Sequence, residues 1–369
     1  MDNIETLKIL KEKIENKESS IYFLTYDTKN NARAAVKNIY DMALALHENG
    51  YKSKILVEEK KTYTGVESWL GEVYKDIPVF CVKEDKVEIF ANDIVVIPEY
   101  YSNVLPQLTN VKGIKVMLIQ QKEYIYETLS IGSKWRDFGI EKAITTTEPT
   151  KKYIKEYFPE TLIYLNPPYI SDNFHPTKNP QKPIIAISCR DRNQQRKVIS
   201  EFYLKYPQLR WITFKDMVQM SYDDFAESLK ECMVSLWIDD ESTLGTFPLE
   251  SMKCEIPVIG KIPNNMPDWM GKNGMWTDDT NKLVEMLATF VFSWLEGVEV
   301  VDEVKEKMRE TVLPYTKELH TQNTLAIFNS LFNGRIEAIK NLIELNEAKK
   351  ASDEVEDIKI EEKPKTKEK

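Results

Sequence analysis

Residues 237–278 read WIDDESTLGTFPLESMKCEIPVIGKIPNNMPDWMGKNGMWTD, and this stretch carries the most informative local pattern in the chain. An apolar strand is predicted to end near Ile238, and a loop that contains Gly245 follows it. Proline is favoured in the first turn of a helix, so Pro248 places a helix start directly after the loop. The pattern therefore predicts a strand, loop and helix unit whose helix begins at the carboxyl end of a strand.

The start of this helix is a predicted phosphate site. The backbone N–H groups of Gly245, Thr246 and Phe247 have no partner inside a helix that opens here, and the positive end of the helix dipole lies behind them. Such an arrangement holds a phosphate. Glu250 lies one turn further along, where its carboxylate can accept two hydrogen bonds from the vicinal hydroxyls of a ribose. The unit thus indicates a site for a phosphate with a ribose beside it.

On either side of this unit, short β-like runs alternate with helical periodicity. In the first half we predict helices near residues 32–50 and 150–157, and strands at 21–26, 54–57, 93–97, 115–119, 143–146 and 162–165. In the second half we predict helices at 194–206, 223–231 and 248–254, and strands at 184–188, 210–213, 233–238 and 256–259. Repeated strand, helix, strand order implies parallel sheets covered by helices on both faces, an α/β fold.

Composition shifts divide the chain into four parts. Residues 166–183 read NPPYISDNFHPTKNPQKP, and their five prolines exclude a regular helix or a central strand. We therefore expect an N-terminal Rossmann-like domain at 1–165, a Pro-rich linker at 166–183, and a C-terminal Rossmann-like domain with terminal helices at 184–347. Residues 348–369 are mostly charged and predict a disordered tail.

Residues 237–278 resemble the donor-binding signature of GT-B glycosyltransferases, in particular the large retaining nucleotide-sugar-dependent family (glycosyltransferase family 4, group 1). That signature runs Glu, Gly, Phe, Gly, with a second Glu eight positions after the first, and then Pro-Val-Ile. The segments 264–268 and 273–278 resemble the family's Gly-Gly-x-Pro-Glu loop and its Asn-Gly-x-x-x-Asp turn. The residues in register with the signature are Gly245, Glu250, Met252, Pro257, Val258 and Ile259.

The resemblance implies two Rossmann-like domains facing across a cleft, with the acceptor side at 1–165 and the nucleotide-sugar side at 184–347. It also implies an enzyme that moves a sugar from a nucleoside diphosphate sugar to an acceptor. We expect a hexosyltransferase that uses a UDP-sugar as co-substrate and needs neither metal nor further cofactor. The acceptor stays open among a glycan, a cell-wall polymer, a protein and a modified DNA base. A sugar-nucleotide epimerase or a glycosyl phosphorylase would share the architecture.

One departure from the signature concerns its first glutamate, which contacts the donor sugar in the family. Ser242 stands at this position, and Glu241 precedes it. Either Glu241 takes over through a shifted loop or the sugar contact is lost. With Arg190, these two residues are the catalytic candidates. The alternative function is a non-catalytic GT-B binding or scaffold protein that has lost the first motif acid.

Basic residues follow the first strand of the second half, where residues 188–197 read SCRDRNQQRK. The two charges of a diphosphate need cationic partners in a partly desolvated cleft. The resemblance implies Arg190 and, about five residues later, either Arg196 or Lys197. The alternative is a solvated basic helix start. Basic residues at a helix N-terminus oppose the dipole, however, and so need another reason to be there.

Acceptor-side candidates follow predicted strands of the first half. They are Asp27, Asn31, Glu99 and Gln120. Capping of the next helix alone would explain Asp27 and Asn31. Glu99 can serve as general base if the reaction inverts configuration, and a surface acid on a loop is the alternative. Each lies near the carboxyl end of a strand, where site residues gather in α/β folds.

Charge and missing motifs disfavour several other classes. The 50 basic and 59 acidic side chains give a net charge of −9, so nucleic acid stays possible as a partner but is not indicated by the charge. No G-x-G-x-x-G turn or P-loop occurs, which disfavours a nicotinamide-dependent dehydrogenase and a P-loop enzyme. Three histidines without metal-ligand spacing disfavour a His-rich metal site.

Location is predicted from two further features. The four cysteines lack C-x-x-C spacing and indicate a reducing compartment. The N-terminus is charged, and no stretch approaches eighteen uninterrupted apolar residues, so we expect neither a signal peptide nor stable membrane insertion. A cytoplasmic protein follows from these expectations.

Overall fold

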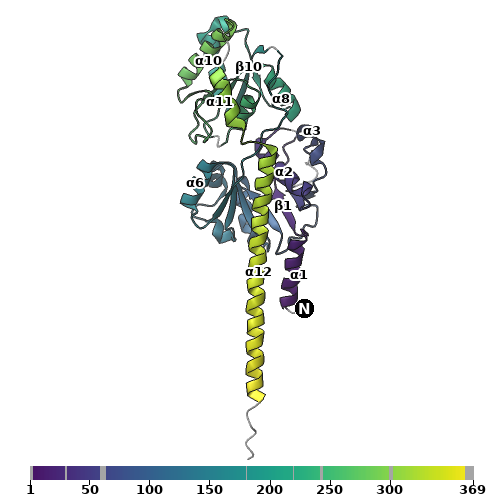
Figure 1. Ribbon diagram of the computed structural model, residues 1–369. Coiled ribbons are helices and arrows are strands. Elements are labelled where there is room, and N and C mark those ends of the chain that lie inside the picture. The colour runs from purple at the N-terminus through teal and green to yellow at the C-terminus, as the bar shows by residue number, and fades with distance from the viewer. Residues whose placement is uncertain are drawn as a thin grey trace, which may run out of the picture.

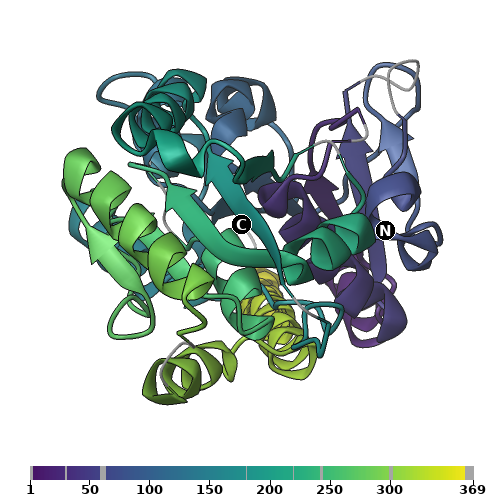
Figure 2. The same cartoon turned by 90° about the horizontal axis from the view of Figure 1, so that it is seen from above.

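The computed structural model describes residues 3–29, 31–58, 64–179, 181–218, 220–241, 244–298 and 302–361. Two α/β domains lie end to end, and the last helix runs along the first of them (Figure 1). Figure 2 looks down the long axis, with the C-terminal domain lying over the N-terminal domain. The α/β class and the two Rossmann-like domains predicted from the sequence are confirmed.

The N-terminal domain is built on a parallel sheet, with strand order β3-β2-β1-β4-β5-β6-β7 over the described residues. Its strands are β1 Ser20–Leu24, β2 Lys52–Val57, β3 Val79–Cys81, β4 Ile94–Pro98, β5 Ile114–Ile119, β6 Lys142–Thr145 and β7 Leu162–Leu165. Its helices are α1 Asn3–Glu15, α2 Ala34–Glu48, α3 Glu67–Leu70, α4 Leu105–Leu108, α5 Glu123–Thr128 and α6 Glu148–Tyr157, with 3-10 turns η2 Glu72–Tyr74, η3 Glu99–Val104 and η4 Trp135–Phe138.

The C-terminal domain has a second parallel sheet, ordered β12-β11-β10-β8-β9 in the part of the chain that the structure describes. Its strands are β8 Lys182–Cys189, β9 Thr213–Asp216, β10 Cys232–Ile238, β11 Val258–Lys261 and β12 Met275–Thr277. Its helices are α7 Arg192–Lys205, α8 Tyr222–Lys230, α9 Thr246–Lys253, α10 Thr280–Leu295 and α11 Asp302–Val312, with the 3-10 turn η5 Pro207–Leu209.

Side-chain burial explains why these segments form central strands. Every residue of β4 and of β10 is buried, which is the pattern of a parallel strand covered on both faces. The strand predicted at 210–213 is β9, and it begins at Thr213 because the 3-10 turn η5 precedes it. The strands β3 and β12 span three residues each, too few for a periodic pattern to be recognised in the sequence.

The last helix corrects two predictions. α12 spans Lys317–Glu361 and packs against α1 and α2 of the N-terminal domain, so assigning all terminal helices of 184–347 to the C-terminal domain was wrong. The helix also passes residue 348, where a disordered tail was predicted. Glu, Lys and Ala, which favour a helix, are frequent from Glu344 onward, and the first proline after the start of α12 is Pro364. Residues 362–369 lie outside the described residues.

The chain crosses between the domains twice, and the two crossings are hydrogen-bonded to each other. The Asn166 amide donates to Thr324 Oγ1 at 2.9 Å. In addition, Ile170 N–H donates to the carbonyl of Tyr315 at 2.9 Å. His320 Nδ1 lies 2.9 Å from the carbonyl oxygen of Pro167. The linker and the chain around the start of α12 therefore cross between the domains side by side, held together by these hydrogen bonds.

Replacing Phe328 tests the place of α12 in the N-terminal core. Phe328 is buried, and its ring centroid lies 5.8 Å from that of Phe23 on β1. Phe328→Ala should lower the free energy of unfolding by about 3–5 kcal/mol, since it leaves a cavity in that core. Leu345→Ala, on the same helix at 66% exposure, is the matched control. Equal urea midpoints for both variants would contradict the packing described here.

Candidate functional site

The carboxyl ends of the two sheets meet in the cleft between the domains. Arg190 follows β8, and its Nη1 donates to Oε1 of Gln121, which follows β5 of the other domain. Arg190 Nε also lies 3.1 Å from Oδ2 of Asp239, which follows β10. The strand order reverses at β8/β10 and at β1/β4, and open α/β sheets bind ligands at the carboxyl ends beside such points.

The loop after β10 requires glycine at position 245. Gly245 precedes α9 with φ 71°, a left-handed conformation that L side chains rarely adopt. A Cβ here would lie 3.0 Å from the Trp237 ring and 3.2 Å from Pro248 Cγ. The backbone therefore turns sharply into α9. Its first N–H groups, at Thr246 and Phe247, have no acceptor inside the helix by position, as a phosphate site needs.

Glu250 lies one turn into α9 and is 3% exposed. Its Oε1 accepts a hydrogen bond of 2.5 Å from the hydroxyl of Tyr222 on α8. Burial raises the pKa of Glu250 to about 7, while the Tyr222 hydrogen bond and the charge of Lys37 act in the opposite direction. Because Lys37 is on α2, Glu250 stands where the two domains meet.

Residues of both domains contact Arg190, and half of its side chain is exposed. Burial raises the pKa of Asp239, and the Arg190 guanidinium partly offsets that effect. The same guanidinium also acts to lower the pKa of Glu99 on the N-terminal side. Arg190 thus lies between carboxylates of both domains, at the place where a ligand in the cleft would meet it.

Glu99 follows β4 and is 1% exposed, so its interpretation as a surface acid was wrong. Its Oε1 accepts a 2.8 Å hydrogen bond from Gln121 N–H, and among the described residues Oε2 has no hydrogen-bond partner. Burial raises the pKa of Glu99 to about 7. A carboxyl group with this pKa can exchange a proton near neutral pH, as a general base must.

Glu241, a catalytic candidate in the loop after β10, lies close enough to the N-terminal domain to act on a charge there. Glu241 is exposed, and its Oε1 accepts a 3.0 Å hydrogen bond from Asn264 Nδ2. Its charge acts to raise the pKa of Glu123 on α5, although burial is the larger cause. Glu241 therefore faces the cleft. Ser242 lies outside the described residues.

The structure does not bring the other basic candidates to Arg190. Arg196 is exposed on α7, and Lys197 lies 3.8 Å from Glu201 on the same helix, with most of its side chain in solvent. Gln195 is the polar residue that α7 buries, and it accepts a 2.8 Å hydrogen bond from Arg192 Nη1. For Arg196 and Lys197 the alternative, a solvated basic helix start, describes the geometry better.

Three acceptor-side candidates have local structural roles. α2 begins at Ala34, later than the capping interpretation requires, and no side chain caps it. Asp27 instead accepts from Thr64 Oγ1 at 2.9 Å, and Asn31 donates to the carbonyl of Thr28 at 3.0 Å. The predicted capping by Asp27 and Asn31 was therefore wrong. Gln120 Nε2 donates to the Ala35 carbonyl at 3.0 Å and so anchors α2 to the sheet.

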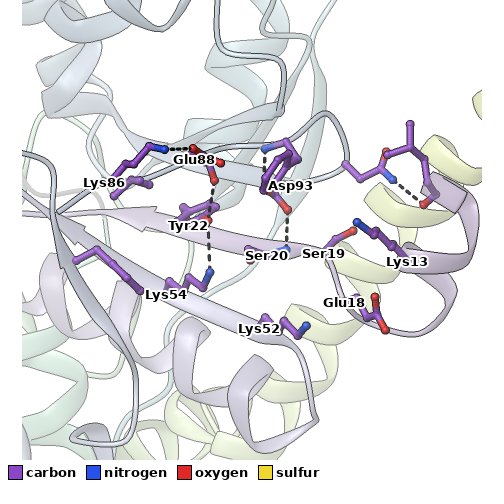
Figure 3. A pocket seen from close by; sticks show the side chains of 15 residues that line it. Lys13, Glu18, Ser19, Ser20, Tyr22, Lys52, Lys54, Lys86, Glu88 and Asp93 are labelled. Atoms are coloured by element: carbon purple, nitrogen blue, oxygen red, sulfur yellow. Dashed lines mark hydrogen bonds and ion pairs between the residues drawn. The ribbon is translucent and has the colours of Figure 1, made fainter. Parts of the chain in front are cut away.

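A cavity of about 430 Å³ lies at the opposite edge of the N-terminal sheet (Figure 3). Ser20, Lys52 and Asp93 line it at the amino ends of their strands or just before them. Asp93 Oδ1 accepts a 2.8 Å hydrogen bond from Ser20 N–H, and Lys86 pairs with Glu88 at 2.6 Å, so these carboxylates already have partners. Ligands of parallel sheets bind at the carboxyl ends, which places the functional site in the cleft.

Comparisons with solved structures agree with this architecture. Sucrose-phosphate synthase from Thermosynechococcus elongatus matches with a TM-score of 0.62 and 11% identity, over 86% of this chain and 100% of that chain. HepE of Anabaena in complex with UDP-glucose matches with a TM-score of 0.58 and 11% identity, over 84% and 99%. The pneumococcal O-GlcNAc transferase GtfA in complex with UDP and GlcNAc matches with a TM-score of 0.56 and 9% identity, over 87% and 99%.

These likenesses establish the fold. The chain has the GT-B fold that the sequence predicted, with two Rossmann-like domains facing across a cleft. No family model matches the chain, and the search of curated proteins found no match. The resemblance to glycosyltransferase family 4 therefore stays a prediction. None of the described helices is both long enough and apolar enough to cross a bilayer.

Sequence reasoning missed the residues that surround Glu250 from other elements. Lys37 and Asp41 form a buried ion pair on α2, and Tyr222 opens α8. A Lys and an Asp four residues apart on a helix usually form a solvated pair, so the pattern gave no reason to expect burial. The one signal was their position within an otherwise apolar stretch of helix.

Gly245→Ala tests the turn that opens α9. Alanine must adopt the left-handed conformation and also displace the Trp237 ring, so the variant should lose more than 1–2 kcal/mol of stability, roughly the cost of the conformation alone. Gly132→Ala is the matched control, because Gly132 has φ 83° and nothing within 4 Å of the added Cβ. Urea denaturation of both variants measures the difference. Equal losses would show that position 245 is not sterically restricted.

Glu99 should impose a pH dependence on folding. Its pKa is raised to about 7 in the folded protein from the ordinary 4.5, so its protonated form stabilises the fold below about pH 4.5. That contribution is lost as pH rises through about 7, an effect on the order of 3 kcal/mol. Glu99→Gln should therefore gain stability relative to the wild type between about pH 5 and about pH 8 in urea denaturation. The exposed Glu160→Gln is the control, and parallel curves for all three proteins would contradict the prediction.

Proposed function

We propose that this protein transfers a sugar from a nucleoside diphosphate sugar, with UDP as the nucleotide, to an acceptor hydroxyl. The observation that carries the proposal is the start of α9, where a glycine that cannot be replaced without strain opens the helix and Glu250 follows one turn later, at the domain boundary. Two structurally similar proteins, HepE and GtfA, were solved with UDP-glucose and with UDP and GlcNAc.

Each part of the donor has a proposed partner. Glu250 accepts hydrogen bonds from the ribose hydroxyls, and the first amides of α9 hold the diphosphate. Arg190 stabilises the negative charge that develops on the leaving UDP. Glu241 is the acid available for the donor sugar. With these groups, no metal is expected in the reaction.

The reaction breaks the bond between the sugar's anomeric carbon and the phosphate oxygen, and UDP leaves with the electron pair. The acceptor oxygen forms the new bond to the anomeric carbon and loses its proton. Glu99 is the proposed base if the configuration inverts, because its free oxygen and its pKa of about 7 suit it to take a proton. The reducing compartment indicated by the cysteines favours the cytoplasm as the place of this reaction.

Binding of nucleotides to the full-length chain tests the proposal. A ligand at a hundred times its Kd stabilises the fold by about 2.7 kcal/mol, and a weaker ligand at the same concentration stabilises it less. UDP and UDP-sugars should therefore raise the thermal unfolding midpoint more than other nucleoside diphosphates do. Absence of stabilisation by any nucleotide would overturn the proposal. Binding without transfer or hydrolysis would instead favour a non-catalytic binding protein.

Replacing Arg190 tests its role in turnover. Arg190→Ala should lower turnover of the best donor about a hundredfold, with the exposed Arg309→Ala as control.

A further inference from the structure

A buried lysine of the N-terminal domain lies near α9, the helix of the C-terminal domain that carries the proposed donor site and is called the donor helix below. Lys37 is 6% exposed, and its Nζ lies 2.7 Å from Oδ2 of Asp41, one turn further along α2. A charged side chain this deeply buried is uncommon and is stable only when it is paired. Asp41 is held in turn by a 2.6 Å hydrogen bond from the hydroxyl of Tyr74. The ammonium is therefore fixed in one position.

Two aromatic rings from outside the N-terminal sheet contact this ammonium. Its Nζ lies 4.0 Å from the ring centroid of Tyr169, on the linker, and 5.1 Å from that of Tyr222, on α8. Both distances are within the range of a cation–π contact, which is stronger when water is excluded. Lys37 of the N-terminal domain thus contacts both the linker and the C-terminal domain.

Tyr222 continues this connection to the donor helix. Its ring faces Lys37, while its hydroxyl donates to Glu250 Oε1. The geometry therefore links Lys37 to the predicted ribose carboxylate through a single side chain. A shift of α2 relative to α8 would move the ammonium away from the Tyr222 ring and change the surroundings of Glu250.

We infer that Lys37 is a positioning residue for the donor site: its ammonium orients Tyr222 and favours the ionised carboxylate of Glu250, so that the N-terminal domain controls how tightly the C-terminal domain grips the ribose. The inference rests on the proposed function of Glu250. It adds a dependence of donor affinity on the relative position of the domains, with donor binding and domain closure as one coupled equilibrium.

The titratable groups around the two residues are few. Glu250 faces Tyr222 from α8 and Lys37 from α2, and Cys254 of α9 itself also lies within its electrostatic range. α11, which packs against α9 as well, directs Arg309 to Glu255 beyond the far end of the helix. Around Lys37, the further groups are Asp41, Tyr169 and, on α12, His320.

Calorimetric titration of UDP from mildly acidic to mildly alkaline pH tests the inference. Affinity in the wild type should rise with pH around a midpoint near 7, as Glu250 ionises. Lys37→Met removes the cation and should move this midpoint upward by about one pH unit, with about fivefold weaker binding at neutral pH. Glu250→Gln cannot titrate at this position, so its curve marks the part that comes from ionisation of UDP itself and of other groups in the cleft, such as Glu99.

Controls separate positioning from folding. Lys115→Met removes another buried lysine of the same domain, whose Nζ donates to the Phe138 carbonyl at 2.8 Å, and should leave the midpoint of UDP affinity unchanged. Tyr222→Phe removes the hydroxyl that links to Glu250 and should also raise the midpoint. If Lys37→Met does not fold, Lys37→Gln replaces it, because this variant also removes the positive charge and keeps a polar side chain beside Asp41.

The outcomes are distinguishable. If UDP does not bind the wild type, the proposed function fails and the inference fails with it. If UDP binds and Glu250→Gln weakens that binding, but the Lys37 variant keeps the wild-type midpoint, the proposed function stands and the role of Lys37 is overturned, whatever the midpoint of Tyr222→Phe. A raised midpoint in both the Lys37 variant and Tyr222→Phe, with none in Lys115→Met, supports the inference.

Discussion

Parallel strand direction is the constraint on which the molecule depends. Every pairing of described strands is parallel in both sheets, so in each domain all carboxyl ends, and the loops that follow them, lie at one edge. Two such edges face each other here, and Arg190 spans them by contacting Gln121 on one side and Asp239 on the other. Residues distant in sequence therefore meet in one cleft, because each follows a strand that stays buried in its own domain.

The same arrangement explains why charged groups are buried at the domain boundary. Glu99 directly follows β4 and Glu250 lies within α9, and burial raises the pKa of each to about 7. Such carboxyl groups cost folding free energy at neutral pH, and their retention in a cleft is typical of functional sites. Lys37 and Asp41 are also buried at this boundary, but they pair with each other, and the pairing offsets part of the cost of burying their charges.

The sequence was sufficient for the fold class and for most strands, because β-like runs with turn residues between them are local patterns. It also located the helix start at Gly245 and the acid at Glu250, since spacing within one segment is preserved in the fold. It failed where tertiary contacts decide. The burial of Glu99, the partners of Lys37 and the outward position of Arg196 depend on segments far away in sequence, which no local period reports.

The return of α12 to the N-terminal domain has a consequence for how the protein is made. Residues of the first domain emerge from the ribosome before those of the second domain, whereas Phe328 and Leu331, which complete its hydrophobic core, are synthesised only after the second domain. The domain must therefore wait, incompletely packed, while the second domain forms. Its exposed apolar surface during that interval is a point at which a chaperone would bind or aggregation would begin.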